Sequence, residues 1–167
     1  MANVDLTTKR VLVAGVETNL GRTIATILAD AGAAVAVVAT ANDPDEAFAT
    51  QRLARKLDGP GQAIDGTNDM AVRVMVRQVS KALGGLDAIV LCTSPEATAL
   101  LTRYGGKELD RSGGRHLIIV GDQNATVEPS DKRPSWILAR VKHVDGNEDR
   151  TAAAVARTIA ADQLLGA

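Results

Sequence analysis

The sequence has 167 residues, with 19 lysines and arginines against 20 aspartates and glutamates, so its formal net charge is −1. This balance excludes the strongly basic surface of proteins that bind nucleic acids or anionic membranes, and an aromatic content of 2% argues against base-stacking surfaces. No apolar run is long enough to cross a bilayer, and no signal-peptide pattern opens the chain. The single cysteine, Cys92, excludes an internal disulfide and suits a reducing compartment. We therefore expect a cytoplasmic protein without a nucleic-acid or membrane partner.

Short runs rich in β-branched residues alternate with helical patterns along the whole chain, which is typical of βαβ units. The predicted strands cover residues 10–14, 35–40, 62–65, 86–92, 116–120 and 136–144, and the predicted helices cover 20–31, 44–57, 68–83, 95–104 and 148–165. A glycine-rich connector at 105–109 is expected to follow the fourth helix. This order predicts an α/β fold of the Rossmann type, with three layers, a mainly parallel sheet of about six strands and helices on both faces.

The last predicted strand carries apolar and charged residues on alternate sides. Ile137, Ala139 and Val141 lie on one face, while Arg140 and Lys142 lie on the other. A strand buried on both faces would not carry that pair, so we expect it to be half exposed. Its direction, parallel or antiparallel at an edge, is not fixed by this pattern, and we favour the parallel placement. A homo-oligomer or another protein partner is expected for a different reason: parallel sheets need helices on both faces, and no crossover helix is expected between the fifth and sixth strands.

A glycine-bearing turn follows the first predicted strand and leads directly into a helix. It runs from Gly15 to Gly21 with the sequence G-V-E-T-N-L-G. Such a turn lets the backbone approach a pyrophosphate, and the helix N-terminus supplies N–H donors and a positive dipole. The sequence therefore predicts a nucleotide site that includes Gly15, Thr18, Asn19, Leu20 and Gly21.

Four landmarks in order and spacing resemble the short-chain dehydrogenase/reductase superfamily and cover residues 9 to 94. The glycine turn matches the family's T-G-x-x-x-G-x-G at its first and last glycines, with Ala14 and Asn19 in place of the Thr and the middle Gly. The other three are Gly32-Ala-Ala-Val35, Asp65-Gly-Thr-Asn68 and Gly85-Leu-Asp-Ala-Ile-Val90. The resemblance implies one domain over 1–167, with a nucleotide-binding half at 1–94 and a shortened second half at 95–167.

The resemblance also implies NAD(P) as cofactor, held by the turn and by further residues after the second to fourth strands: Thr40, Asp65, Gly66 and Cys92. The second strand ends in Ala39-Thr-Ala-Asn42, without the acid that usually binds the ribose of NAD. Thr40 and Asn42 are able to hydrogen-bond a 2′-phosphate, so NADP is slightly favoured over NAD. No metal is expected, because His116 and His143 lack ligand spacing.

The second half departs from the family where the family carries its catalytic residues. The family places Tyr-x-x-x-Lys on a long crossover helix between strands five and six, whereas residues 121–134 contain no Tyr and are interrupted by Pro129 and Pro134. We therefore expect that helix to be absent. No residue is assigned a catalytic role, and the candidates for a relocated one are Tyr104 (followed by Lys107), Asp122 and Lys142.

Three hypotheses of function follow. The first is a truncated, degenerate short-chain-type protein that binds NAD(P) or another nucleotide without the family's hydride transfer, a pseudoenzyme with a binding or regulatory role. The second is a structural or partner subunit whose nucleotide site stays empty. The third is an NAD(P)-dependent oxidoreductase with relocated catalytic residues, or with a site that a partner completes.

Overall fold

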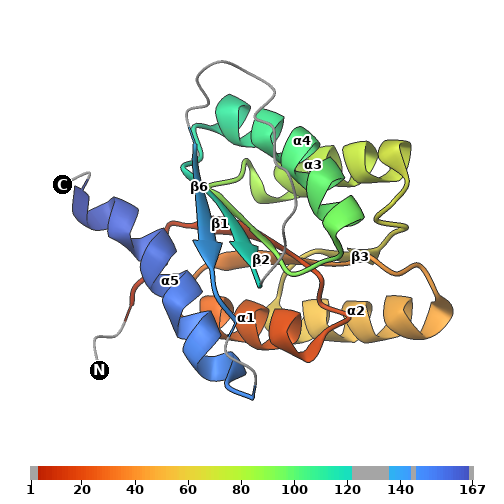
Figure 1. Ribbon diagram of the computed structural model, residues 1–167, viewed down its shortest axis with the longest axis horizontal. Coiled ribbons are helices and arrows are strands. Elements are labelled where there is room, and N and C mark those ends of the chain that lie inside the picture. Colours follow the sequence, from red (N-terminus) through yellow and green to blue (C-terminus); the bar gives the residue numbers. More distant parts are fainter. Residues whose placement is uncertain (1–3, 122–135, 144–145, 166–167) are drawn as a thin grey trace.

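Six strands form one parallel sheet in the order β3-β2-β1-β4-β5-β6, in a computed structural model that describes residues 4–121, 136–143 and 146–165 (Figure 1). The strands are β1 (Arg10–Ala14), β2 (Ala34–Ala39), β3 (Gly61–Ala63), β4 (Ala88–Leu91), β5 (His116–Val120) and β6 (Ile137–Val141). β1 pairs with both β2 and β4, so the order of strands reverses there. In open α/β sheets such a reversal opens a crevice outside the carboxyl ends of the strands.

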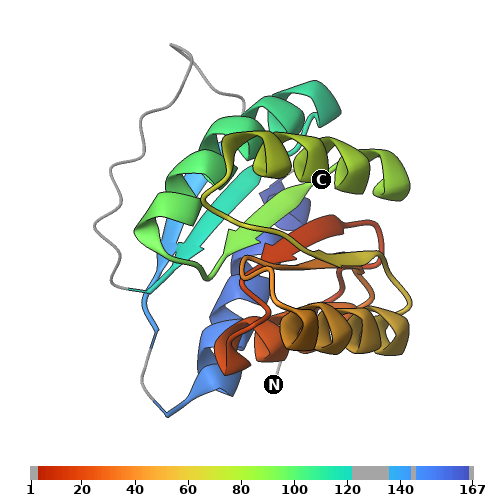
Figure 2. The same ribbon diagram turned by 90° about the vertical axis from the view of Figure 1, so that its right-hand side faces the viewer.

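In the described part of the chain, five helices cover the two faces of this sheet. They are α1 (Asn19–Asp30), α2 (Pro44–Leu57), α3 (Asp69–Leu83), α4 (Pro95–Ser112) and α5 (Glu148–Leu165). α1, α2 and α5 lie on one face, and α3 and α4 lie on the other (Figure 2). Each face has its own apolar core of mostly aliphatic side chains, as a sheet buried on both sides requires. The predicted three-layer Rossmann fold is confirmed. No helix in the described part of the chain is both long and apolar enough to cross a bilayer.

Most element positions agree with the sequence prediction, but the fourth helix was predicted too short. α4 continues through Gly105 and Gly106 to Ser112, where the predicted connector stood, and it ends at a left-handed Gly113. A Cβ on Gly105 would lie 2.6 Å from Ile89 Cδ1, and one on Gly106 would lie 2.8 Å from Trp136 Cζ2. The two glycines therefore let α4 approach the sheet and the indole ring, and this packing outweighs their low helix propensity.

β6 is an edge strand that pairs parallel with β5, which is the direction that the sequence analysis favoured. It is partly exposed: Ala139 and Val141 pack partly buried against the core of the α1 side, while Ile137 and Leu138 are 55% and 37% exposed. Lys142 follows the strand and is exposed. Residues 122–135 lie outside the described residues, so the expected absence of a crossover helix between β5 and β6 stays a prediction.

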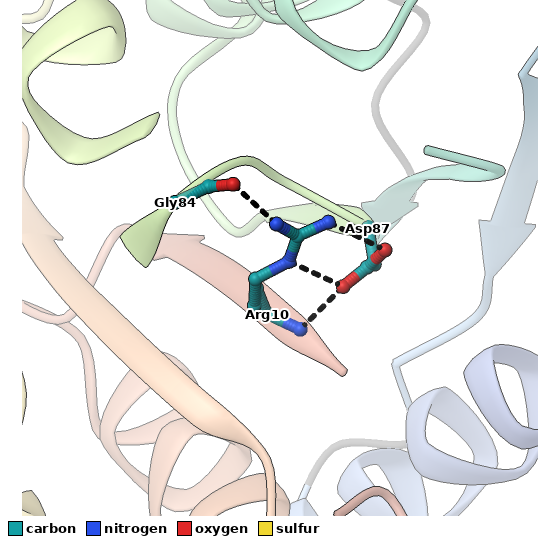
Figure 3. A network of polar contacts seen from close by, with 3 residues as sticks. All are labelled: Arg10, Gly84 and Asp87. Atoms are coloured by element: carbon teal, nitrogen blue, oxygen red, sulfur yellow. Dashed lines mark hydrogen bonds and ion pairs between the residues drawn. The ribbon is translucent and has the colours of Figure 1, made fainter. Parts of the chain in front are cut away.

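At the N-terminal ends of the strands, an ion pair joins β1 to the segment before β4 (Figure 3). Asp87 Oδ2 accepts hydrogen bonds from Arg10 N (2.8 Å) and Arg10 Nε (2.9 Å), and Oδ1 accepts from Nη2 (3.2 Å). Arg10 Nη1 also donates to the carbonyl of Gly84. Burial alone raises the pKa of the Asp87 carboxyl, but the hydrogen bonds and charge of Arg10 outweigh burial, and the net pKa lies below its ordinary value.

Substitution of Asp87 by Asn is expected to lower the free energy of unfolding by about 1–3 kcal/mol at neutral pH, because it removes hydrogen bonds to a charged group. The folded pKa of Asp87 is lowered, so its stabilisation is complete above the unfolded pKa of about 4 and is lost as the pH falls through the folded value. Urea unfolding of wild type and D87N from pH 7 to pH 2.5 measures this. The difference between them should shrink below about pH 4, whereas D30N, at an exposed carboxylate, should behave like wild type throughout.

Candidate functional site

The turn after β1 is fixed between two neighbouring strands at the carboxyl edge of the sheet. Gly15 has φ +103°, a conformation that L side chains rarely adopt, and a Cβ there would lie 2.2 Å from the carbonyl oxygen of Cys92. Gly15 N donates to Val38 O on β2 (2.8 Å), while Cys92 N donates to Ala14 O (2.9 Å). The turn therefore lies at the reversal of strand order, where the sequence predicted the nucleotide site.

The N-terminus of α1 opens directly from this turn. Thr18 caps the helix: its Oγ1 accepts from Gly21 N (3.0 Å) and donates to Gly15 O (2.8 Å). The N–H groups of Asn19 and Leu20, the first two helical residues, have no intrahelical acceptor. The first turn of α1 contains no acidic residue. These donors and the helix dipole favour an anion at this point.

Asn19, in place of the family's middle glycine, is an ordinary helical residue. It is the first residue of α1 and is exposed. Among the described residues, only Asp58 has a positive φ without being glycine, so Asn19 does not use the left-handed conformation that Asn tolerates. The turn therefore forms without strain at residue 19.

Glu17 is the functional candidate that the sequence analysis did not identify. Its carboxylate accepts three contacts from Thr40, the residue that follows β2: Thr40 N lies 3.1 Å from Oε1 and 3.0 Å from Oε2, and Thr40 Oγ1 lies 2.5 Å from Oε2. On the other side, Arg22 Nη1 donates to the carbonyls of Val16 and Glu17, each at 3.2 Å. The turn thus places an acid at the end of β2. The sequence did contain a signal for this role: Glu17 is an acidic residue inside a turn that otherwise favours an anion.

The ends of β2 and β3 meet beside Glu17. Gly66 is buried, its N–H donates to Thr40 O (3.2 Å), and a Cβ on it would lie 2.7 Å from Thr40 Cβ. Asp65 is exposed, and its Oδ1 accepts from Thr67 N (3.0 Å) and Thr67 Oγ1 (2.7 Å). Both hydrogen bonds lower the pKa of the Asp65 carboxyl, and the bond from the Thr67 hydroxyl has the larger effect. Thr40, Asp65 and Gly66 are therefore brought together with the glycine turn.

Cys92 lies against Gly15 of the turn and is a buried, protonated thiol. The residue directly follows β4 and is 8% exposed. Burial, and secondly the negative charge of Glu17, raise the pKa of the Cys92 thiol to about 12. A thiol in this environment is an inert core group rather than a nucleophile.

A thiol-reactive disulfide reagent at pH 8 is expected to label native Cys92 at least about 100-fold more slowly than the unfolded chain, because the thiolate fraction falls about tenfold per pKa unit above the pH and burial restricts access. The release of the chromogenic thiol, with and without denaturant, measures both rates on the same sample. Native labelling as fast as that of the unfolded chain would contradict the buried placement.

The described candidates for a relocated catalytic role, Tyr104 and Lys142, do not lie at this turn. Tyr104 and Lys107 lie on one helix, α4, with Lys107 Nζ 5.7 Å from the tyrosine ring centroid. Tyr104 OH donates to Asp69 Oδ1 (2.5 Å). This hydrogen bond is the main cause of the raised pKa of the Tyr104 phenol. A proton donor for hydride transfer needs a lowered pKa instead. Lys142 lies at the edge of the sheet, and Asp122 falls outside the described residues. No metal-ligand group of three or more His, Cys, Asp or Glu gathers within 4–121, 136–143 and 146–165.

The family model described as short chain dehydrogenase matches residues 9–112, well over half of the 167 residues. The chain belongs to the short-chain dehydrogenase family. The match includes every residue predicted to bind the nucleotide, from Gly15 to Cys92, and extends through α4. No curated protein matches the chain.

Solved structures share the fold of this short-chain dehydrogenase family member at low sequence identity. A short chain dehydrogenase from Mycobacterium smegmatis has a TM-score of 0.64 at 16% identity, over 96% of this chain and 90% of that one. Ribose-5-phosphate isomerase from Brucella melitensis has a TM-score of 0.62 at 19% identity, over 72% of this chain and 54% of that one. Carveol dehydrogenase from Mycobacterium avium, in complex with NAD, has a TM-score of 0.56 at 16% identity, over 71% and 56%. The chain therefore spans about half the length of the last two proteins.

Proposed function

We propose that this family member binds a dinucleotide, NAD(P), at the carboxyl edge of the sheet and does not perform the family's hydride transfer on its own. The observation that carries the proposal is the turn from Gly15 to Gly21, which presents the free N–H groups of Asn19 and Leu20 at the helix N-terminus. The NAD-bound state of the carveol dehydrogenase structure supports the class of ligand.

The residues present fit a dinucleotide. The N-terminus of α1 offers donors and a positive dipole to a diphosphate, and its first turn holds no acid that would repel one. Asp65, beside Gly66 at the end of β3, offers an exposed carboxylate to an adenine amino group. When bound, the nicotinamide of such a cofactor supplies hydride chemistry. This chain's residues would hold and orient the nucleotide.

The properties of the candidate for acid catalysis, Tyr104, support the role of a pseudoenzyme. Proton donation to a carbonyl requires a group of lowered pKa within hydrogen-bond reach of the substrate oxygen. Tyr104 is held by Asp69 with a raised pKa, in the α3–α4 layer on the far side of the sheet from α1. We therefore propose nucleotide binding in a regulatory role. The cytoplasmic location, the single-domain division and the preference for NADP remain predictions, although the Glu17 carboxylate on Thr40 weighs against the last.

Substitution of Asn19 by Asp tests the binding proposal. A negative charge at the first residue of α1 stabilises the helix by about 0.3–1 kcal/mol through its dipole, while it repels a diphosphate held by the same N–H groups. We expect N19D to unfold at the same or a higher temperature than wild type. Its affinity for NADH or NADPH, measured by calorimetric titration, is expected to be at least about tenfold weaker.

The matched control is Asn147→Asp, the same change at the N-cap of α5, where Asn147 Oδ1 accepts from Arg150 N (3.1 Å). N147D is expected to bind as wild type does. Equal affinity of N19D and wild type would place the ligand elsewhere, and absence of binding by wild type at millimolar ligand would overturn the proposed function.

A structural role in an assembly is a second candidate, and the exposed edge favours it. β6 ends the sheet and exposes the apolar side chains of Ile137 and Leu138. Strands of this kind pair with other chains unless charges or loops protect them. Light scattering at rising protein concentration separates the candidates: a mass that increases supports an assembly through this edge, and a constant monomer mass contradicts it.

A further inference from the structure

We propose that Glu17 makes this nucleotide site reject a phosphate on the adenosine ribose, so that the chain prefers NAD to NADP. This inference rests on the proposed dinucleotide binding and reverses the slight preference for NADP that the sequence suggested. It assigns cofactor selectivity to a residue of the glycine turn instead of a residue of β2.

The position of the Glu17 carboxylate is the first argument. In dinucleotide-binding sheets, the ribose beside the adenine lies at the end of the second strand, where an acid accepts its 2′-hydroxyl. Here β2 ends in Ala39 and Thr40, and neither is an acid. Glu17 reaches that point from the turn, and both of its carboxylate oxygens lie within 3.1 Å of Thr40 N. The chain therefore supplies the acid from a different element.

The hydrogen-bond capacity of the pair is the second argument. Thr40 N–H and Thr40 Oγ1–H both donate to Glu17, so Thr40, one of the two residues predicted to bind a 2′-phosphate, has both of its donors already used. An ionised carboxylate has about four lone-pair sites, and Oε1 accepts only one shared contact from Thr40. A ribose hydroxyl is able to donate to it, whereas a phosphate has only acceptor oxygens to offer.

The charge on Glu17 is the third argument. No lysine or arginine in the described part of the chain lies within ion-pair distance of its carboxylate. The neighbouring Arg22 directs Nη1 at the backbone carbonyls of Val16 and Glu17 rather than at the carboxylate. A 2′-phosphate would therefore meet an uncompensated negative charge, and like charges brought together at a binding site weaken binding.

Calorimetric titration with NADH and NADPH, which differ by that phosphate, tests the inference on wild type, E17Q and D45N. Glu17→Gln keeps an acceptor oxygen for Thr40 and removes only the charge. Asp45→Asn removes an exposed charge from the first turn of α2, close to the same edge. Wild type is expected to bind NADPH at least about tenfold more weakly than NADH. In E17Q the ratio should fall below about threefold through tighter binding of NADPH, and D45N should keep the wild-type ratio.

A second test needs no variant. The preference of wild type for NADH over NADPH should decrease with added salt, because screening weakens the repulsion of the 2′-phosphate. Equal affinities or a preference for NADPH in wild type, or an unchanged ratio in E17Q that melts as wild type does, would overturn the role of Glu17 while leaving dinucleotide binding in place. Binding of neither ligand by any of the three proteins would overturn the proposed function itself, and this inference with it.

Discussion

The close contact between Gly15 and the carbonyl oxygen of Cys92 is the constraint on which the site depends. A Cβ at residue 15 would lie 2.2 Å from that oxygen, so only glycine lets the chain leave β1 against the end of β4. The same turn brings Gly21 onto Gly15 O, where a Cβ would again lie at 2.2 Å. These two approaches direct α1 with its N–H groups toward the reversal of strand order, where nucleotides bind in such sheets.

Glu17 gives this turn a second property beyond the anion-binding N–H groups of α1. The turn holds donors for a diphosphate and, two residues earlier, a carboxylate bound to the end of β2. The two groups act on different parts of a ligand: the helix N-terminus attracts negative charge, and Glu17 excludes it next to Thr40. The chain thereby compensates for the missing acid of the second strand with one from the turn.

Much of the fold follows from the sequence because periodicity and turn chemistry are local. β1 and β5 were predicted at their observed bounds, and Gly15 and Gly21 indicated the site by their spacing after a strand. The length of α4 was not predictable in this way, because Gly105 and Gly106 are favoured there by Ile89 and Trp136, which are distant in sequence. The Glu17–Thr40 contact joins residues 23 positions apart, and no local pattern encodes it.

A groove between α3 and α4 offers a competing place for an anion. It is lined by Arg73, Arg77, Lys107 and Arg111, with Glu108 of the same groove bonded to Arg111 (3.1 Å). It lies in the α3–α4 layer, on the opposite face of the sheet from α1, and none of its residues belongs to the glycine turn. The location of a bound nucleotide therefore decides between the two surfaces.

Backbone amide chemical shifts of the isotope-labelled protein, recorded during titration with NADH, test the central claim most directly. The account predicts that the largest saturable shifts are those of Asn19 and Leu20, together with Thr40 and Gly66 at the ends of β2 and β3. Shifts confined to the α3–α4 groove, or no saturable shift at millimolar NADH, would contradict a nucleotide site built on the glycine turn.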